Sequence, residues 1–239
     1  MSINQQTPKS GDKLTAEQEA VLAQELKNKK TQKALMWCLI AVTAVVCVIL
    51  IYLFAIRRPG IEASDNAIGQ ADTSLSLGQD SVALMQYKQV ADNYGYDAGN
   101  RAKLNAAIIL YTQAMSEENE AARNAKLDEA ISYLKKYDAK ETVIGASAKS
   151  LEGDCYVNKG EYAEGLACFK KAVKLSDNNA YYTPLFLMKQ ANVEHEMKDY
   201  KAEAATYQEL VDKYPTYGNA LNIDFKKYLE RAKALAAEK

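Results

Sequence analysis

Few residues in this chain have the type and spacing that metal binding or catalysis requires. His195 is the single histidine and stands between Glu194 and Glu196. A zinc site needs several His or Cys ligands that converge, and the sequence contains no such cluster. We therefore interpret His195 as a solvated side chain on a helix and expect no metal ion.

Ser132 and Lys135 are spaced as in the S-x-x-K motif of serine acyl-transfer enzymes. The K-T-G motif that completes this signature is missing, and a serine and a lysine one turn apart are common on helices. The sequence also lacks a phosphate-binding loop and a dinucleotide fingerprint. We predict that the protein is not an enzyme, uses no cofactor and has no small-molecule substrate.

The four cysteines fall into two pairs with different surroundings. Cys38 and Cys47 lie in an apolar run and behave as small apolar residues. Cys155 and Cys168 could form a disulfide that closes a loop of about 13 residues and stabilises the fold by roughly 3 kcal/mol. Cys168 precedes a predicted core residue, however, so its side chain could point away from Cys155. Both states remain open.

The longest apolar run is Ala34–Ile56, which has 23 residues and no charge. As a helix it would span about 34 Å, enough to cross a hydrocarbon core of about 30 Å with some tilt. Lysines precede the run, whereas Arg57 and Arg58 follow it, and the positive-inside rule then leaves the N-terminus in the cytoplasm. A cleaved signal peptide would need a shorter core and a small-x-small site, which Arg-Arg-Pro does not provide.

The segment before this span has two parts. Residues 1–13 are polar and aperiodic, so we expect them to be disordered. From Leu14 to Lys33 the pattern is helical, and Thr15 with Gln18 fits a capping box. This helix either docks a partner or is a solvated helix whose basic end meets the membrane.

Charge differs between the two sides of the span. Residues 1–58 carry 8 Lys/Arg against 4 Asp/Glu, whereas residues 59–239 carry 22 against 27, so the net charges are +4 and −5. An acidic exported part argues against nucleic acid as a partner.

Beyond the span, Leu151–Asn179 reads as two short amphipathic helices joined by a turn at Lys159-Gly160. Small residues let the two helices approach closely, and aromatic residues fill the space between them. The predicted packing residues of this hairpin are Gly153, Tyr156, Tyr162, Gly165, Phe169 and Ala172. These residues stand at the consensus offsets of the tetratricopeptide (TPR) repeat, which the stretch resembles, with Gly165 in place of the usual Ala.

Neighbouring segments repeat the pattern. Tyr200 and Tyr207 take equivalent packing positions in the next hairpin, where Glu203 occupies a consensus Ala position. The preceding hairpin contains the polar run MSEENEAARNA, which makes it about eleven residues longer than a standard repeat and which we expect only to extend its helices. We therefore predict an all-α protein: a transmembrane helix followed by a TPR-like α-solenoid.

A closing helix follows the repeats. Tyr217 lies beyond the last hairpin, so we expect it to contribute little to packing. Residues 218–239 carry an apolar stripe and would cover the last repeat. The predicted organisation is a cytoplasmic tail, a span, a linker that breaks at Pro59-Gly60, a repeat domain and a capping helix, at residues 1–33, 34–56, 57–64, 65–217 and 218–239.

In a TPR stack the first helix of each hairpin lines the concave groove, so the resemblance implies a partner-binding surface. Here that surface would present Asp154, Asn158, Lys189, Asn192 and His195. A clamp for a C-terminal carboxylate needs several converging cations and amides. Asp154 disturbs such a clamp, so we expect a mixed polar groove for segments of other proteins.

The whole layout resembles a bacterial family of single-span, membrane-anchored TPR proteins that includes the ancillary TPR subunit of the Sec translocon. The matching stretches are YKQVADNYG, AKLDEAISYLKKY, LEGDCYVNKGEYAEGLACFKKAV and DYKAEAATYQELVDKYP. The resemblance implies an inner-membrane scaffold with a periplasmic domain that contacts translocon subunits, a periplasmic chaperone or exported proteins. The alternative is a structural or regulatory adaptor of another envelope complex, in which the span makes the specific contact.

Overall fold

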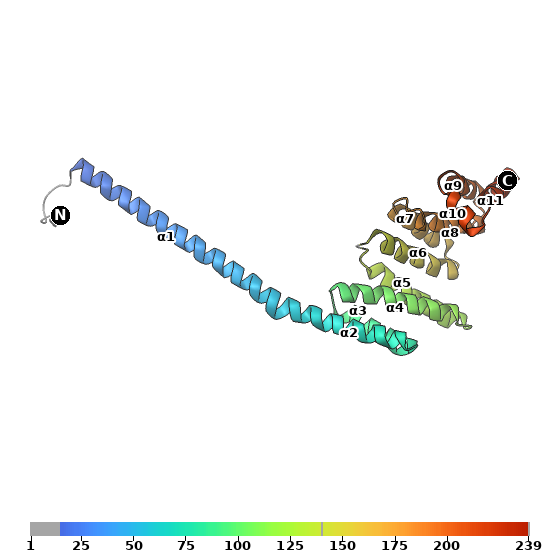
Figure 1. Ribbon diagram of the computed structural model, residues 1–239, viewed down its shortest axis with the longest axis horizontal. Coiled ribbons are helices and arrows are strands. Elements are labelled where there is room, and N and C mark those ends of the chain that lie inside the picture. Colours follow the sequence, from blue (N-terminus) through green and yellow to red (C-terminus); the bar gives the residue numbers. More distant parts are fainter. Residues whose placement is uncertain (1–14, 140, 239) are drawn as a thin grey trace. The chain divides into compact units, whose positions relative to one another are not determined.

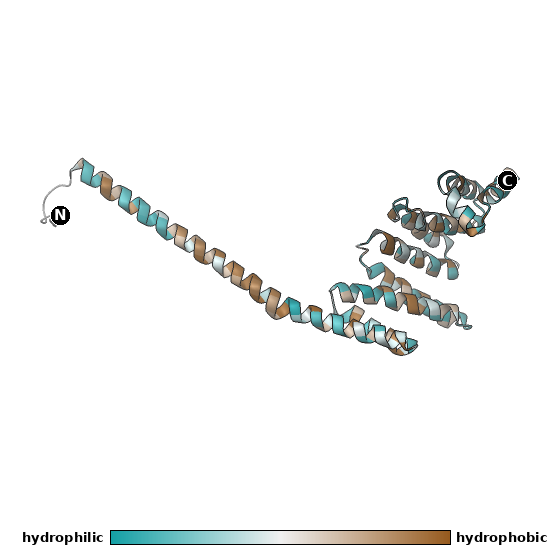
Figure 2. Cartoon of the chain, viewed as in Figure 1, coloured by the Kyte–Doolittle hydropathy of each residue, from teal (hydrophilic) through white to brown (hydrophobic). Residues whose placement is uncertain are grey.

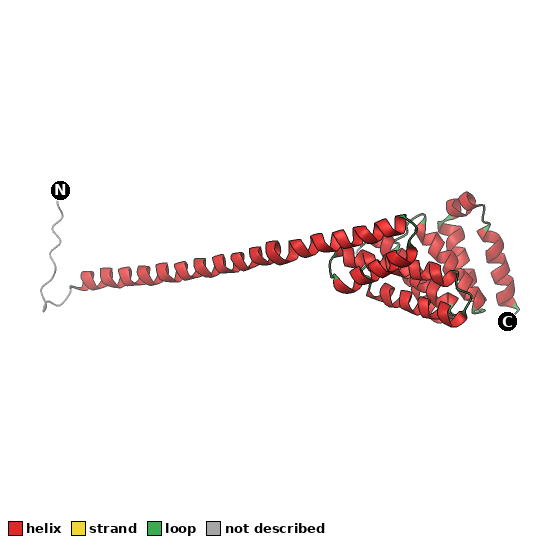
Figure 3. Cartoon of the chain, turned by 90° about the horizontal axis from the view of Figure 1, so that it is seen from below, coloured by secondary structure: helices red, strands yellow, loops and turns green. Residues whose placement is uncertain are grey.

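The computed structural model describes residues 15–139 and 141–238. Every regular element in these ranges is a helix (Figure 3). The chain forms two compact units, one ending at Pro59 and the other beginning at Gly60. The predicted all-α class is confirmed.

The first unit contains α1 (Ala16–Ile51) and the π-helix η1 (Tyr52–Arg57). The Thr15 N–H donates to Gln18 Oε1 at 3.1 Å, as the capping box predicts. No residue of α1 or η1 is buried, and an apolar stretch interrupts the hydrophilic surface of this helix (Figure 2). The helical stretch that contains them is long and apolar enough to cross a membrane. The segment predicted to be disordered, residues 1–13, lies outside the described residues.

The predicted linker, residues 57–64, does not break the helix: Arg57 ends η1 and α2 (Arg58–Ser76) follows at once, although the chain does divide into its two units at Pro59-Gly60. The wide π turn, in which the Arg58 N–H bonds to Leu53 O, shifts the carbonyls that the Pro59 ring would otherwise meet. Gly60 serves packing rather than a turn, since a Cβ there would lie 2.5 Å from the Tyr96 hydroxyl oxygen.

The second unit is a solenoid of helices that pack consecutively (Figure 1). One continuous hydrophobic core runs from α2 to α6, and further clusters join α6 and α7 to α8, and α8 and α9 to the C-terminal helices. The helices between α2 and the C-terminal segment are α3 (Asp80–Asn93), α4 (Asp97–Met115), α5 (Glu120–Lys136), α6 (Thr142–Asn158), α7 (Tyr162–Leu175), α8 (Tyr182–Glu196) and α9 (Tyr200–Lys213).

Helices α6 and α7 approach each other closely at two glycines. A Cβ added to Gly153 would lie 2.7 Å from the Phe169 ring, and one added to Gly165 would lie 2.6 Å from Val157. Phe169 is 2% exposed and Ala172 is fully buried. The two glycines therefore set the distance between these helices.

The tyrosines predicted to pack do so unequally. Tyr207 is buried, whereas Tyr156 and Tyr200 are half-buried. Tyr162 is 36% exposed, so its prediction as a packing residue is wrong. It is the first residue of α7 and lies beside the hairpin turn, where its ring is left at the edge of the core.

The long hairpin α4–α5 extends its helices as predicted. Helix α4 continues to Met115 and α5 begins at Glu120, so only a short turn separates them. The Asn119 side chain accepts from the Ala122 N–H and caps α5. An ion pair between Lys126 and Glu117 at 2.7 Å closes this end of the hairpin.

The C-terminal segment is two helices, not the single one predicted over 218–239: α10 (Pro215–Leu221) and α11 (Phe225–Ala237). Asn222 adopts a left-handed conformation (φ 55°) that ends α10, and the Asp224 carboxylate caps α11. Helix α11 packs on α9 and covers it. Tyr217 is 8% exposed and contacts the Tyr181 ring, so the expectation that it packs little is wrong.

Candidate functional site

Two of the predicted groove residues meet between α6 and α8. The Lys189 ammonium donates to the Asp154 carboxylate and, at 3.2 Å, to Ser150 Oγ. It also lies 5.8 Å from the centre of the Phe169 ring. The first helices of two successive hairpins are therefore joined by a partly buried ion pair.

The same surface continues to α4. Asn158 Nδ2 donates to Asp154 O at 2.8 Å and contacts the Tyr111 hydroxyl of α4 at 3.5 Å. Ile108 and Met115, three residues before and four after Tyr111, share its helix face and are 45% and 41% exposed. The TPR resemblance did not indicate these three residues as part of the groove, although their spacing alone places them on one helical stripe.

We call this surface the α4–α6–α8 face. Asn192, one turn after Lys189, is exposed and belongs to it. The face consists of Ile108, Tyr111, Met115, Ser150, Asp154, Asn158, Lys189 and Asn192.

Charges on this face are already matched within the protein. Burial raises the pKa of the Asp154 carboxyl, although the Lys189 ammonium pulls it down. Burial, and secondarily the Asp154 carboxylate, raises the pKa of Tyr111. Arg101, seven residues before Ile108, pairs with Asp72 at 3.0 Å. A charged ligand would have to compete with these pairs, whereas amide and apolar groups would not.

His195 does not join the other predicted groove residues. Its Nδ1 lies 2.9 Å from a carboxylate oxygen of Glu203, which is fully buried on α9. The Arg231 guanidinium of α11 donates to the other Glu203 oxygen at 2.8 Å. The interpretation of His195 as a solvated residue is wrong, because the carboxylate at the consensus Ala position draws its ring toward α9.

A second buried carboxylate, Glu194, lies in the same hairpin and is 1% exposed. It accepts from Thr206 Oγ1 at 2.7 Å and from Gln190 Nε2 at 2.9 Å. Burial raises the pKa of Glu194 against these hydrogen bonds. Burial, followed by the Glu203 carboxylate, also raises the pKa of Tyr207 to about 12. The last hairpin and α11 thus enclose an acidic network that the sequence pattern did not indicate.

The cysteines of α6 and α7 are both free thiols. Cys155 is fully buried and Cys168 is 7% exposed. Burial raises the pKa of Cys155 to about 12 and that of Cys168 to about 11. Neither thiol is therefore ionised near neutral pH, and neither has the character of a nucleophile.

Ser132 and Lys135 line a hollow of about 440 Å³ together with Tyr156 and Lys159. An S-D-N tripeptide, which can accompany S-x-x-K, does occur at residues 176–178. Its serine hydroxyl donates to Val173 O and contacts Thr183 Oγ1, and the tripeptide does not line this hollow. The structure therefore does not bring the two motifs together.

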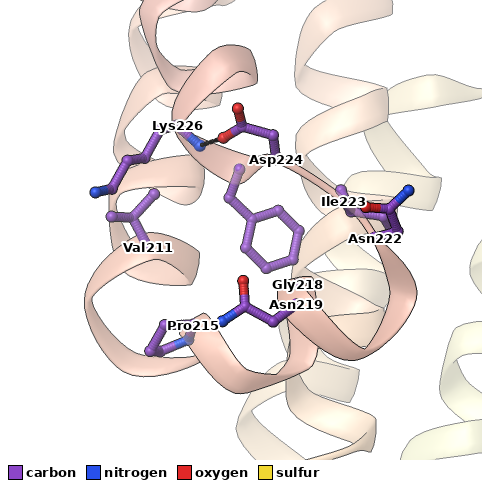
Figure 4. Close-up of a pocket in the computed structure, with 9 residues that line it drawn as sticks. Val211, Pro215, Gly218, Asn219, Asn222, Ile223, Asp224 and Lys226 are labelled. Carbon is purple, nitrogen blue, oxygen red and sulfur yellow. Dashed lines mark hydrogen bonds between the residues drawn. The ribbon is translucent and has the colours of Figure 1, made fainter.

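A pocket of about 380 Å³ lies where α9, α10 and α11 meet (Figure 4). Pro215 and Asn219 lie on one side of it, and Asp224 and Lys226 lie on the opposite side. The Asp224 carboxylate accepts from the Lys226 and Lys227 N–H groups, so it is engaged in capping α11. This pocket shares no residue with the α4–α6–α8 face.

Within residues 15–139 and 141–238, no group of three or more His, Cys, Asp or Glu side chains could hold a metal ion. The α4–α6–α8 face is the surface on which side chains from three successive hairpins converge. Comparison of the chain with protein-family models and with curated proteins gave no match, so its function is inferred from the chemistry of this face.

Proposed function

We propose that the protein is a membrane-anchored scaffold whose α4–α6–α8 face binds extended segments of other proteins. The observation that carries the proposal is the run of side chains from Tyr111 through Asn158 and Asp154 to Lys189, which crosses three successive first helices. An extended chain is a ligand that can contact all three helices at once. No catalytic step is part of this proposal.

The chemistry of the face favours a polar, uncharged segment with apolar side chains. Asn158 and Asn192 offer amides that both donate and accept, which suits the N–H and C=O groups of an extended backbone. Ile108 and Met115 offer exposed apolar contacts. Each contact would contribute on the order of 1 kcal/mol, so affinity would come from their sum.

The setting follows from the span and from the family resemblance. The excess of lysines before Ala34–Ile56 favours an exported C-terminal domain. The resemblance to membrane-anchored TPR proteins supports a bacterial inner-membrane location with the solenoid in the periplasm. The bound segments would then belong to newly translocated proteins, translocon subunits or a periplasmic chaperone.

The test is photo-crosslinking of the full chain in native membranes, with a benzoyl-phenylalanine probe at Thr112, which neighbours the face on α4. The triple variant Ile108→Ala, Asn158→Ala and Asn192→Ala should lose most crosslinked partners, whereas each single change should weaken crosslinking only a few-fold. A matched control replaces Leu175, Gln208 and Asn219 by Ala; all three are exposed and lie outside the face. The control should retain its partners.

Unchanged crosslinking in the triple variant would contradict the proposal. A second chain, in which Ala34–Ile56 is replaced by a generic apolar helix, separates the alternative function. Loss of partners in that chain alone would identify the span as the specific contact and the protein as an adaptor.

A further inference from the structure

Four lysines stand directly before the membrane span. Lys27, Lys29, Lys30 and Lys33 lie on α1, and the apolar run begins at Ala34 of the same helix. Because α1 is continuous, its rise of about 1.5 Å per residue places all four lysines within roughly 10 Å of the start of the span. We call these four residues the α1 lysine cluster.

The protein itself supplies no partner for the charges of this cluster. All four lysines are exposed, and no residue of α1 is buried. No ion pair joins any of them to a carboxylate of residues 15–139 and 141–238, although Glu25 stands four residues before Lys29, a spacing that favours a pair on a helix. In the solenoid, by contrast, Lys88 pairs with Glu129 at 2.6 Å. The cluster is therefore available to a ligand outside the chain.

The acidic residues of α1 lie farther from the span. Glu25, Glu19 and Glu17 stand 9, 15 and 17 residues before Ala34, which corresponds to about 14, 23 and 26 Å along the helix. The Debye length is about 8 Å at physiological ionic strength, so charges at those distances are largely screened from the membrane surface. Three of the four lysines lie within this length. The surface therefore meets the lysines rather than the net charge of the whole segment.

The opposite end of the span Ala34–Ile56 carries less positive charge. The seven residues before the span hold four lysines and no acid, whereas the seven residues after it hold Arg57, Arg58 and Glu62. The Arg58 guanidinium lies 4.8 Å from the centre of the Phe54 ring, so the helix itself already contacts this charge. Attraction for an anionic surface is therefore concentrated at the N-terminal end of the span.

We propose that the α1 lysine cluster binds the headgroups of anionic phospholipids, so that the protein gathers these lipids around the N-terminal end of its span. A helix that enters a bilayer meets the lipid headgroups at this position, and their anionic phosphates complement ammonium groups. Lysine is a point charge without the planar fork of arginine, so the cluster recognises headgroup charge and not headgroup shape. The inference rests on the membrane anchoring in the proposed function and is independent of the α4–α6–α8 face.

Trp37 provides the measurement, because it is the single tryptophan of the chain, is 67% exposed and stands one turn after Lys33. The full chain is reconstituted into phosphatidylcholine vesicles that contain dibrominated phosphatidylglycerol or dibrominated phosphatidylcholine, whose bromine atoms quench a nearby indole. At low salt, phosphatidylglycerol should be enriched near Trp37 roughly threefold or more over phosphatidylcholine. The enrichment should vanish at about 1 M salt, where the Debye length is about 3 Å. Phosphatidylserine, of equal net charge, should give the same enrichment.

Two variants test the role of charge. The first carries Lys27→Gln, Lys29→Gln, Lys30→Gln and Lys33→Gln. It should lose the enrichment, whereas Arg at the same four positions should retain it. Both vesicle leaflets have the same composition, so the direction of insertion does not affect the result. The matched control Glu17→Gln/Glu19→Gln makes the net charge more positive far from the span and should leave the enrichment unchanged.

Equal quenching by the two brominated lipids at low salt would overturn the proposal, as would an enrichment that survives the Gln changes or high salt. Loss of the enrichment in the Arg variant would overturn it too, because charge would not be what the cluster recognises. Absence of quenching by either lipid would overturn the membrane anchoring and this inference together. Lysine-dependent binding of a single-stranded DNA oligonucleotide, without any lipid enrichment, would assign the cluster to nucleic acid instead.

Discussion

Phe169 is the side chain on which the α6–α7 hairpin depends most directly. Its ring is 2% exposed and lies against Gly153 and under the Lys189 ammonium. Phe169→Ala should lower the free energy of unfolding by about 3–5 kcal/mol, because it leaves a cavity that the helices cannot close. Urea unfolding of residues 60–239, the second compact unit, measures this change. The matched variant Tyr162→Ala removes a ring that is 36% exposed and should cost less than half as much. Equal costs would show that Phe169 is not the main packing residue of the hairpin.

Glu203 needs hydrogen-bond donors inside the fold, because its carboxylate is fully buried between His195 and Arg231. Arg231→Met should destabilise residues 60–239 by on the order of 2–3 kcal/mol, since it leaves a desolvated carboxylate oxygen without a donor. Glu203→Met combined with Arg231→Met should recover most of this loss, because a buried pair can be replaced by apolar groups of similar volume at little cost. A double variant as unstable as the sum of the single ones would contradict this coupling.

At the scale of elements, the glycines of α6 and α7 decide how closely two helices pack. Gly165→Ala restores the TPR consensus residue, yet its Cβ would lie 2.6 Å from Val157. We expect a destabilisation of about 1–3 kcal/mol, measured by urea unfolding, because the helices must separate. The comparison is Gly69→Ala on α2, where nothing lies within 4 Å and helix propensity should raise stability by about 0.4–1 kcal/mol. A stabilising Gly165→Ala would mean that α6 and α7 lie farther apart.

Also at this scale, the α4–α5 hairpin shows what an insertion can do without a new loop. The polar run MSEENEAARNA begins at Met115, the last residue of α4, and supplies the turn and the first residues of α5, which starts at Glu120. The insertion therefore lengthens the second helix of this hairpin rather than adding a separate loop.

For the whole molecule, the proposed periplasmic location of the solenoid depends on which way the span crosses the membrane. Five lysines lie within about 20 residues before the span, and two arginines follow it. A phosphatase reporter fused at the C-terminus should be active outside the cytoplasm, and a cytoplasmic fluorescent reporter fused at the N-terminus should be bright. Exchange of the lysines Lys27, Lys29, Lys30 and Lys33 for Gln should weaken this preference. A C-terminal reporter active only in the cytoplasm would overturn the periplasmic location.

The order of apolar and small residues along the chain was enough to predict the helical class, the apolar span and the close contact of α6 with α7. Helix periodicity and the approach of Gly153 to Phe169 depend on residues that are close in sequence. Tertiary structure decided the rest. Pro59-Gly60 reads as a break in the helix, yet Gly60 lies inside α2 and packs closely against the ring of Tyr96, 36 residues away. The sequence predicts His195 as a groove residue, but in the fold its ring lies beside Glu203 of α9, which in turn accepts a hydrogen bond from Arg231 of α11. Partners brought together by folding decide which polar side chains are already satisfied, and only the remaining ones are open to a ligand.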